Sequence, residues 1–218
     1  ADDPLEQLDG KTPLEVCKNP FFDSLCAKAE LGLVKTIPEG FPPGSDTAIM
    51  SIFGCDPRKY FSGRAPLELA ASGGVMPEGG AAYRCNMVNL GGDPAGPFEE
   101  RVMVSHSAGS IEGEESDELV TWLFSQPEFA ALAEEARLTV RPGIVLAPPH
   151  DHLNEKIGPL LPRGCANAGV LLGLMRKAAQ LLPGHPVNKK REAEGKLPAN
   201  CIWFWAEGKG AKLPNFVE

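Results

Sequence analysis

The chain lacks the features that would assign it to a membrane or a nucleic-acid-binding class. No apolar run in its 218 residues approaches the length of about 18 that a membrane-spanning helix needs. The first ten residues are acidic, so we predict no signal peptide and expect a cytoplasmic protein. Lysine and arginine number 21 against 29 aspartates and glutamates, and this net charge of −8 argues against a nucleic-acid partner. It leaves room for a local basic pocket that holds a small acidic substrate.

Cysteine is too sparse and too widely spaced for a disulfide scaffold or a zinc site. No two cysteines form a Cys-x-x-Cys pair, whereas structural zinc sites normally have closely spaced ligands. We therefore expect reduced, mostly buried thiols. The six cysteines are Cys17, Cys26, Cys55, Cys85, Cys165 and Cys201.

Glycine (24) and proline (21) are abundant and separate the periodic segments. Helical spacing and start signals predict helices beginning at Pro13 and covering residues 21–30, 46–53, 114–124, 127–137 and 166–182. Strands are predicted over 33–37, 82–90, 101–105, 138–147 and 201–205, the second and third forming a hairpin. Strands mixed with helices favour an α/β or mixed α+β fold. The glycine- and proline-rich break at 73–80 predicts a domain boundary.

The most informative segment is residues 41–48, where a Pro-Pro-Gly turn delivers Ser45 to the first turn of a predicted helix. Free N–H groups and the helix dipole favour anions at such a position. A serine hydroxyl there can contact a phosphate or accept a phosphoryl group. The alternative is a plain helix N-cap, since serine is a preferred cap residue. Position alone leaves both interpretations open.

Further motifs accompany Ser45 along nearly the whole chain. They are KTIPEGFPPGSD at 35–46, DPRKY at 56–60, GRAPLE at 63–68, YRCN at 83–86, SAG at 107–109, PPHD at 148–151, HPVNKKR at 185–191 and PAN at 198–200. In content and order they resemble the archaeal-type cofactor-independent phosphoglycerate mutases, a family of the alkaline-phosphatase superfamily.

The resemblance implies an intramolecular phosphotransfer that interconverts 3-phosphoglycerate and 2-phosphoglycerate through a phosphoserine intermediate. Ser45 occupies the position of the family's nucleophile, which is also a metal ligand. Two divalent metal ions, manganese or a similar ion such as magnesium, cobalt or zinc, are implied for the intact protein. Serine is a poor nucleophile until a metal or a base lowers its pKa, and two metals can hold both reacting oxygens.

The implied partner is a small phosphorylated three-carbon acid, and its phosphate and carboxylate require fixed cations. A Lys-Lys-Arg run can instead be a solvated face. The His150-Asp151-His152 run lacks a third and fourth ligand, so it does not predict a metal site. The candidate substrate-binding residues are Arg64, Arg84, Arg191, Lys189 and His150.

Three positions depart from the family pattern. Ile49 replaces a polar residue, Cys55 a common tyrosine, and Ser110 a basic residue. These departures leave two alternatives open. One is a related enzyme acting on another phosphorylated metabolite, such as a phosphonopyruvate decarboxylase-like or homoserine-kinase-like protein. The other is a non-catalytic domain that binds such a metabolite.

The resemblance also implies a domain division. Residues 1–75 would be part of a phosphatase-like core that carries the nucleophile, 76–190 an inserted substrate-binding domain, and 191–218 a return segment. The family's other metal ligands lie in segments before and after the match. We therefore expect a fragment that lacks both ends, holds no metal by itself and is inactive alone; an oligomer remains compatible with the sequence.

Overall fold

The computed structural model of the protein describes residues 3–41, 43–138, 144–210 and 213. At its centre lies a three-stranded sheet in the order β2-β1-β3. Strand β1 (Ala81–Gly91) pairs antiparallel with β2 (Val102–Ser105) on one side and with β3 (Cys201–Lys209) on the other. The predicted hairpin and the predicted strands at 82–90, 101–105 and 201–205 are confirmed.

Strand β3 comes from the far end of the chain and follows β1 along most of its length. The pairing runs from Ala81 opposite Lys209 to Val88 opposite Cys201. Residues 81–91 and 201–209, which the sequence analysis assigned to different segments, therefore form one sheet. The division into three segments itself stays a prediction.

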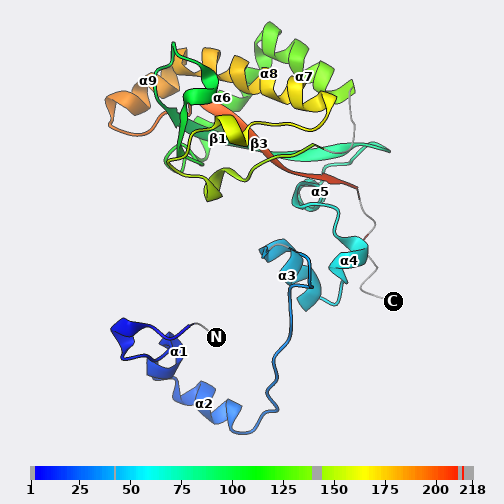
Figure 1. Ribbon diagram of the computed structural model, residues 1–218, viewed down its shortest axis with the longest axis vertical. Coiled ribbons are helices and arrows are strands. Elements are labelled where there is room, and N and C mark those ends of the chain that lie inside the picture. Colours follow the sequence, from blue (N-terminus) through cyan, green and yellow to red (C-terminus); the bar gives the residue numbers. More distant parts are fainter. Residues whose placement is uncertain (1–2, 42, 139–143, 211–212, 214–218) are drawn as a thin grey trace.

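Helices α6 (Glu114–Ser125), α7 (Pro127–Leu138), α8 (Ala166–Leu181) and α9 (Pro186–Ala193) lie on one side of this sheet (Figure 1). The first three were predicted within a few residues. Apolar side chains at helical spacing face the sheet, and burying each large one stabilises the fold by roughly 1.5–3 kcal/mol. The largest fully buried side chains include Trp203, Phe129, Met103, Leu119 and Leu123.

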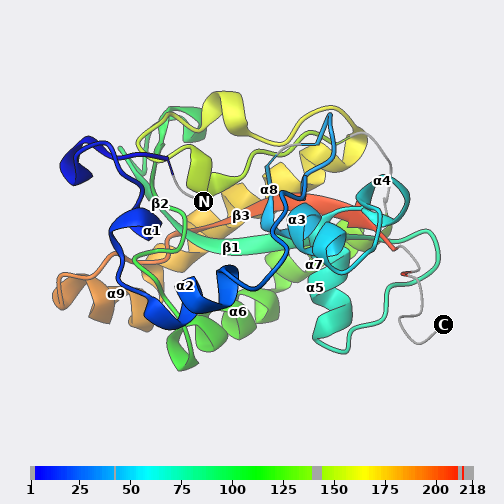
Figure 2. The same ribbon diagram turned by 90° about the horizontal axis from the view of Figure 1, so that it is seen from below.

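Three short helices, α3 (Ser45–Ile52), α4 (Pro57–Tyr60) and α5 (Arg64–Ala71), lie on the other side of the sheet (Figures 1 and 2). Two glycines bring the start of α5 close to the end of β3. A Cβ at Gly63, whose φ is 119°, or at Gly208 would overlap backbone atoms of the opposite segment. The Lys209 N–H donates to the Ser62 carbonyl at 3.0 Å, which closes this contact.

The N-terminal segment confirms two predicted helices and overturns one predicted strand. Helix α1 (Pro13–Val16) begins with a capping box between Thr12 and Glu15, and α2 (Pro20–Cys26) covers part of 21–30. Residues 33–37 form no strand, and Leu33 is fully exposed. A strand needs a partner for its backbone hydrogen bonds, and none of the described strands runs beside this segment.

Other predictions need correction or stay open. Helix α7 extends to Leu138, residues 139–143 lie outside the described ranges, and 144–147 carry only an isolated bridge between Val145 and Arg163. No disulfide joins the six cysteines, all of which lie in the described ranges, but only Cys55 and Cys201 are buried, so the prediction of mostly buried cysteines was wrong. Within the described ranges, no helix has the length and apolar content needed to cross a membrane.

Candidate active site

Ser45 is the first residue of α3, and its hydroxyl is not used as a cap. The N-cap is Gly44, and no side-chain cap hydrogen bond is present. The simple N-cap interpretation of Ser45 is therefore wrong. Thr47 and Met50, which are 2% and 7% exposed, anchor the buried face of the helix, while the Ser45 side chain is exposed at its N-terminus. The serine thus sits at the positive end of the helix dipole, where the Thr47 N–H is already bonded to Asp46 Oδ1 at 2.8 Å.

Ser45 opens into a cavity of about 360 Å³ that also contains Arg64 and His150. Three predicted site residues from distant parts of the sequence therefore meet. Helix α3 supplies Ser45, the start of α5 supplies Arg64, and the short 3-10 helix Pro149–Asp151 supplies His150. Further lining side chains include Asp46, Phe61, Asp151, Trp205 and Glu207.

Glu68 connects two of the predicted arginines. Arg64 donates from Nε to Oε1 of Glu68 at 2.7 Å, and the Nε of Arg84 lies 2.7 Å from Oε2. Arg84 lines a neighbouring cavity rather than the one that contains Ser45. The carboxylate of Glu68 therefore fixes the orientation of Arg64 and links it to Arg84. The sequence analysis missed this role, although the i,i+4 spacing from Arg64 was a usable signal.

Trp205 forms a wall of the cavity and holds Arg84 from the other side. The Arg84 guanidinium carbon lies 4.3 Å from the centre of the indole ring, a cation–π contact. The indole Nε1 donates to Asn86 Oδ1 at 2.9 Å, and the His150 ring packs edge-on at 4.9 Å between centroids. The sequence analysis placed Trp205 only in the strand predicted over 201–205. The side chain is 6% exposed and, besides packing in the core, it orients Arg84, Asn86 and His150.

Glu207 places a carboxyl group on the same cavity. Partial burial raises the pKa of Glu207 above its ordinary value, because desolvation disfavours the charged form. The carboxyl group therefore gains a proton more readily than an exposed glutamate does.

The remaining two candidates lie on α9, away from this cavity. Arg191 is 4% exposed and donates to the carbonyls of Ala108 and Leu197 at 2.8 and 3.0 Å and to Glu115 at 2.6 Å. Its guanidinium group ties α9 to the 107–109 motif. Lys189 is exposed on the same helix. Their roles in substrate binding stay predictions, and neither lines the cavity that contains Ser45.

The described residues do not form a complete metal site. Among them, no group of three or more histidines, cysteines, aspartates or glutamates is placed to hold a metal ion. His152 pairs through Nδ1 with Glu155 at 3.0 Å, whereas His150 lies near Asp151 and Trp205, so the two histidines have different neighbours. Ser45 and Asp46 are oxygen donors at the cavity, but two metals need more ligands than these.

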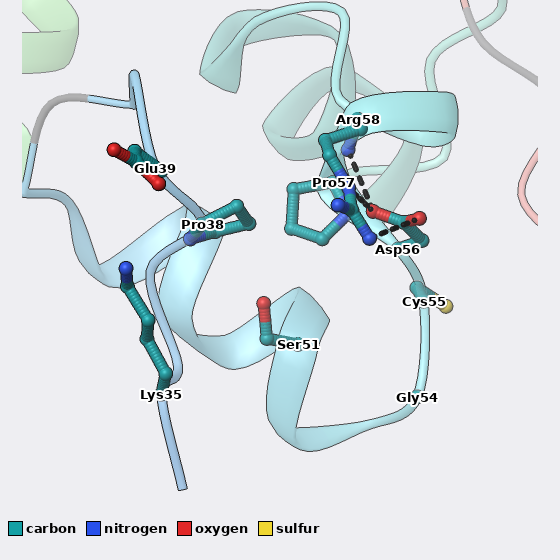
Figure 3. A pocket seen from close by; sticks show the side chains of 9 residues that line it. All are labelled: Lys35, Pro38, Glu39, Ser51, Gly54, Cys55, Asp56, Pro57 and Arg58. Atoms are coloured by element: carbon teal, nitrogen blue, oxygen red, sulfur yellow. Dashed lines mark hydrogen bonds and ion pairs between the residues drawn. The ribbon is translucent and has the colours of Figure 1, made fainter.

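A second cavity of about 480 Å³ lies near the end of α3 (Figure 3). It contains none of the predicted site residues. Arg58 binds Asp56 through Nε and a terminal nitrogen, at 3.0 and 3.1 Å, so both groups are already paired. Cys55, one of the family departures, is 2% exposed at its wall. We assign no chemistry to this cavity.

The fold and the site define an α/β protein in which a helix-terminal serine and an arginine share one cavity. A family model for 2,3-bisphosphoglycerate-independent phosphoglycerate mutase matches residues 26–188. The chain therefore belongs to this family, as its motifs predicted.

Individual proteins agree with this assignment. A 2,3-bisphosphoglycerate-independent phosphoglycerate mutase of Methanosarcina acetivorans is 39% identical, covering 100% of this chain and 55% of the relative. A solved structure from Pyrococcus horikoshii matches with a TM-score of 0.60 at 28% identity, over 99% of this chain and 51% of that one. The cofactor-independent phosphoglycerate mutase of Thermoplasma acidophilum matches with a TM-score of 0.50 at 25% identity, over 100% and 59%. The chain thus spans about half the length of the curated relatives it matches.

Proposed function

We propose that this chain is the nucleophile-bearing half of an isomerase, a 2,3-bisphosphoglycerate-independent phosphoglycerate mutase. The whole protein would interconvert 3-phosphoglycerate and 2-phosphoglycerate, and its substrate would be a small phosphorylated three-carbon acid. The observation that carries the proposal is the shared cavity of Ser45, Arg64 and His150 in a chain of this family. We expect the protein to work in the cytoplasm without a nucleic-acid or membrane partner.

The chemistry assigned to Ser45 is a double transfer. Its Oγ attacks phosphorus, the bond from phosphorus to the substrate's hydroxyl oxygen breaks, and the serine proton ends on that oxygen. The other hydroxyl oxygen of glycerate then attacks the phosphoserine, the bond from phosphorus to serine Oγ breaks, and the proton of that hydroxyl ends on Oγ, which restores the free serine. The positive end of α3 beside Ser45 and the guanidinium of Arg64 are suited to stabilising the charge on the transferring group.

The proposal includes two divalent metal ions, with manganese the first candidate, and Ser45 as one of the ligands. When bound, such ions would lower the pKa of the serine hydroxyl. Because the described residues do not complete the ligand set, we expect the rest of it to come from other parts of the whole protein. We therefore expect this chain to be inactive alone.

The test is an enolase-coupled mutase assay without 2,3-bisphosphoglycerate, run with and without manganese, on the whole protein and on the 218-residue chain. Ser45→Ala should abolish turnover by the whole protein. Ser51→Ala is the matched control, because Ser51 lies near the other end of α3 and its hydroxyl donates to the Thr47 carbonyl at 3.2 Å. A whole protein with no activity would overturn the proposal, and the substrate panel would then move to other phosphorylated metabolites.

A further inference from the structure

Arg101, which directly precedes β2, carries a positive charge in the interior. Its side chain is 5% exposed, and one terminal nitrogen donates to the Leu90 carbonyl at 3.0 Å. Its Nε has no hydrogen-bond partner in the described structure, and no carboxylate lies within ion-pair distance there. The nearby Cys201 thiol supplies no counter-charge, because burial raises its pKa to about 12 and keeps it neutral.

An unpaired buried guanidinium is unfavourable. Removing such a charge from water costs several kcal/mol unless a partner of opposite charge or strong hydrogen bonds compensate. Arginine stays protonated at all physiological pH values, so it cannot escape this cost by losing a proton. A hydrogen-bond acceptor or a negative charge close to Arg101 would therefore be favourable.

Arg101 lines a cavity of about 150 Å³, which lies between the β1–β2 connection and α8. Arg176, from α8, lines the same cavity and is about half exposed at its edge, where it also pairs with Glu99. Phe98 and Pro94 supply apolar walls. The space suits one small group rather than a nucleotide or other drug-sized ligand, which needs roughly 300 Å³ or more.

We propose that this cavity is a binding site for a small oxyanion, namely phosphate or the phosphate group of a small ester. Arg101 and Arg176 both line this small space, and a pair of guanidinium groups matches the geometry of a phosphate group. The cavity shares no lining residue with the one that contains Ser45. The proposal is therefore independent of the proposed phosphotransfer.

The test is a titration of the isotope-labelled chain with inorganic phosphate, in which NMR follows the Nε–H signal of Arg101. A second titration uses a phosphate ester, glycerol phosphate, and a third uses sodium chloride at matched ionic strength. We expect a saturable shift with phosphate beyond the chloride control, and the ester arm shows whether a substituted phosphate also enters. An Nε–H signal that responds to neither phosphate nor ester would mean that water satisfies Arg101, and would overturn the proposal.

Single substitutions test whether phosphate binds in this cavity. Arg176→Met removes the second guanidinium at an exposed position and should weaken phosphate binding about tenfold, the usual effect of losing a hydrogen bond to a charged group. Lys177→Met is the matched control, since it removes a neighbouring cation that pairs with Glu128 and lies outside the cavity. Ser45→Ala should leave the titration unchanged. Equal weakening by the Arg176 and Lys177 variants would show a non-specific charge effect and contradict the site.

Discussion

The guanidinium group of Arg84 is stacked over the indole ring of Trp205, with 4.3 Å between its central carbon and the ring centre. The same arginine pairs with Glu68, which in turn holds Arg64 at the cavity that contains Ser45. One strand pair thus supplies a platform on which an arginine network is fixed. Such pre-organisation reduces the ordering cost of binding an anion.

Glu68→Gln should weaken substrate binding by the whole protein, because the amide cannot hold two guanidinium groups as a carboxylate does. We expect KM for phosphoglycerate to rise about tenfold, with a smaller change in kcat, which is the signature of lost positioning. Stability should fall by about 1 kcal/mol or less, since exposed ion pairs contribute little. Steady-state kinetics and urea unfolding measure the two effects.

Glu128→Gln is the control for this prediction. It also removes an exposed ion pair, the one with Lys177, but neither Glu128 nor Lys177 lines the cavity that contains Ser45. It should leave KM unchanged. If both variants changed KM equally, Glu68 would have no specific role in positioning the arginines.

Trp205→Phe should keep an aromatic ring under Arg84 but remove the hydrogen bond to Asn86 and weaken the cation–π contact. We expect about 1–2 kcal/mol of lost stability and a raised KM. Trp203→Phe is the matched variant, since its Nε1 donates to the Ala147 carbonyl at 2.8 Å and it does not line the cavity. It should lose similar stability without the change in KM. The reverse pattern would contradict the role assigned to Trp205.

Glu207 should make stability depend on pH. Its pKa is raised in the folded state by desolvation, so the folded state binds the proton more tightly than the unfolded chain. The resulting stabilisation is complete below the unfolded pKa and is lost as pH rises through the folded pKa. Glu207→Gln, which never ionises, should therefore raise Tm more at pH 7 than at pH 4.

Glu128→Gln should show the opposite pH dependence. The hydrogen bond from Lys177 lowers the pKa of Glu128, so its stabilisation is present above the unfolded pKa and is lost as pH falls. Removing the Glu128 carboxylate should then lower Tm more at pH 7 than at pH 4.

The two variants together test both pKa shifts. Equal effects of Glu207→Gln on Tm at both pH values would show that the pKa of Glu207 is not raised.

The thiols should react in an order set by burial. At pH 8 a thiol with a pKa of about 12 is ionised to only about one part in ten thousand, and Cys201 is also fully buried. Iodoacetamide should modify the exposed Cys17 quickly and leave Cys55 and Cys201 intact until the chain unfolds. Peptide mass spectrometry after timed quenching measures this, and native-state modification of Cys201 at the rate of Cys17 would contradict the packing of β3 against α8.

The sequence predicted the elements whose apolar pattern faces the core. Helices α6, α7 and α8 and strands β1 and β3 carry long periodic patterns, and all were found within a few residues. The strand predicted at 33–37 failed because its apolar pattern has no partner strand in the described structure. The short helices α4 and α5 were missed because they are too short for a clear periodic pattern, whereas α1 and α3, which are equally short, were predicted from the turn and start signals before them.

Some residues of the candidate site could be predicted from the sequence and others could not. Motifs identified Ser45, Arg64 and His150, since these residues carry the family resemblance. Trp205 and Glu207 were missed because their roles depend on contacts that only the fold creates, whereas the i,i+4 spacing of Glu68 from Arg64 was a signal that could have been used. The close approach at Gly63 and Gly208 brings α5 to the end of β3, and no local sequence pattern in either segment predicts this contact.

The most direct test of the proposed mechanism is whether Ser45 carries the phosphoryl group during turnover. The whole protein is incubated with manganese and 3-phosphoglycerate and quenched in acid, under which phosphoserine is stable, and the peptides are mapped by mass spectrometry. We expect phosphate on Ser45 during turnover and none in the Ser45→Ala variant. Turnover that proceeds without phosphate on Ser45, or that survives Ser45→Ala, would contradict the proposed mechanism.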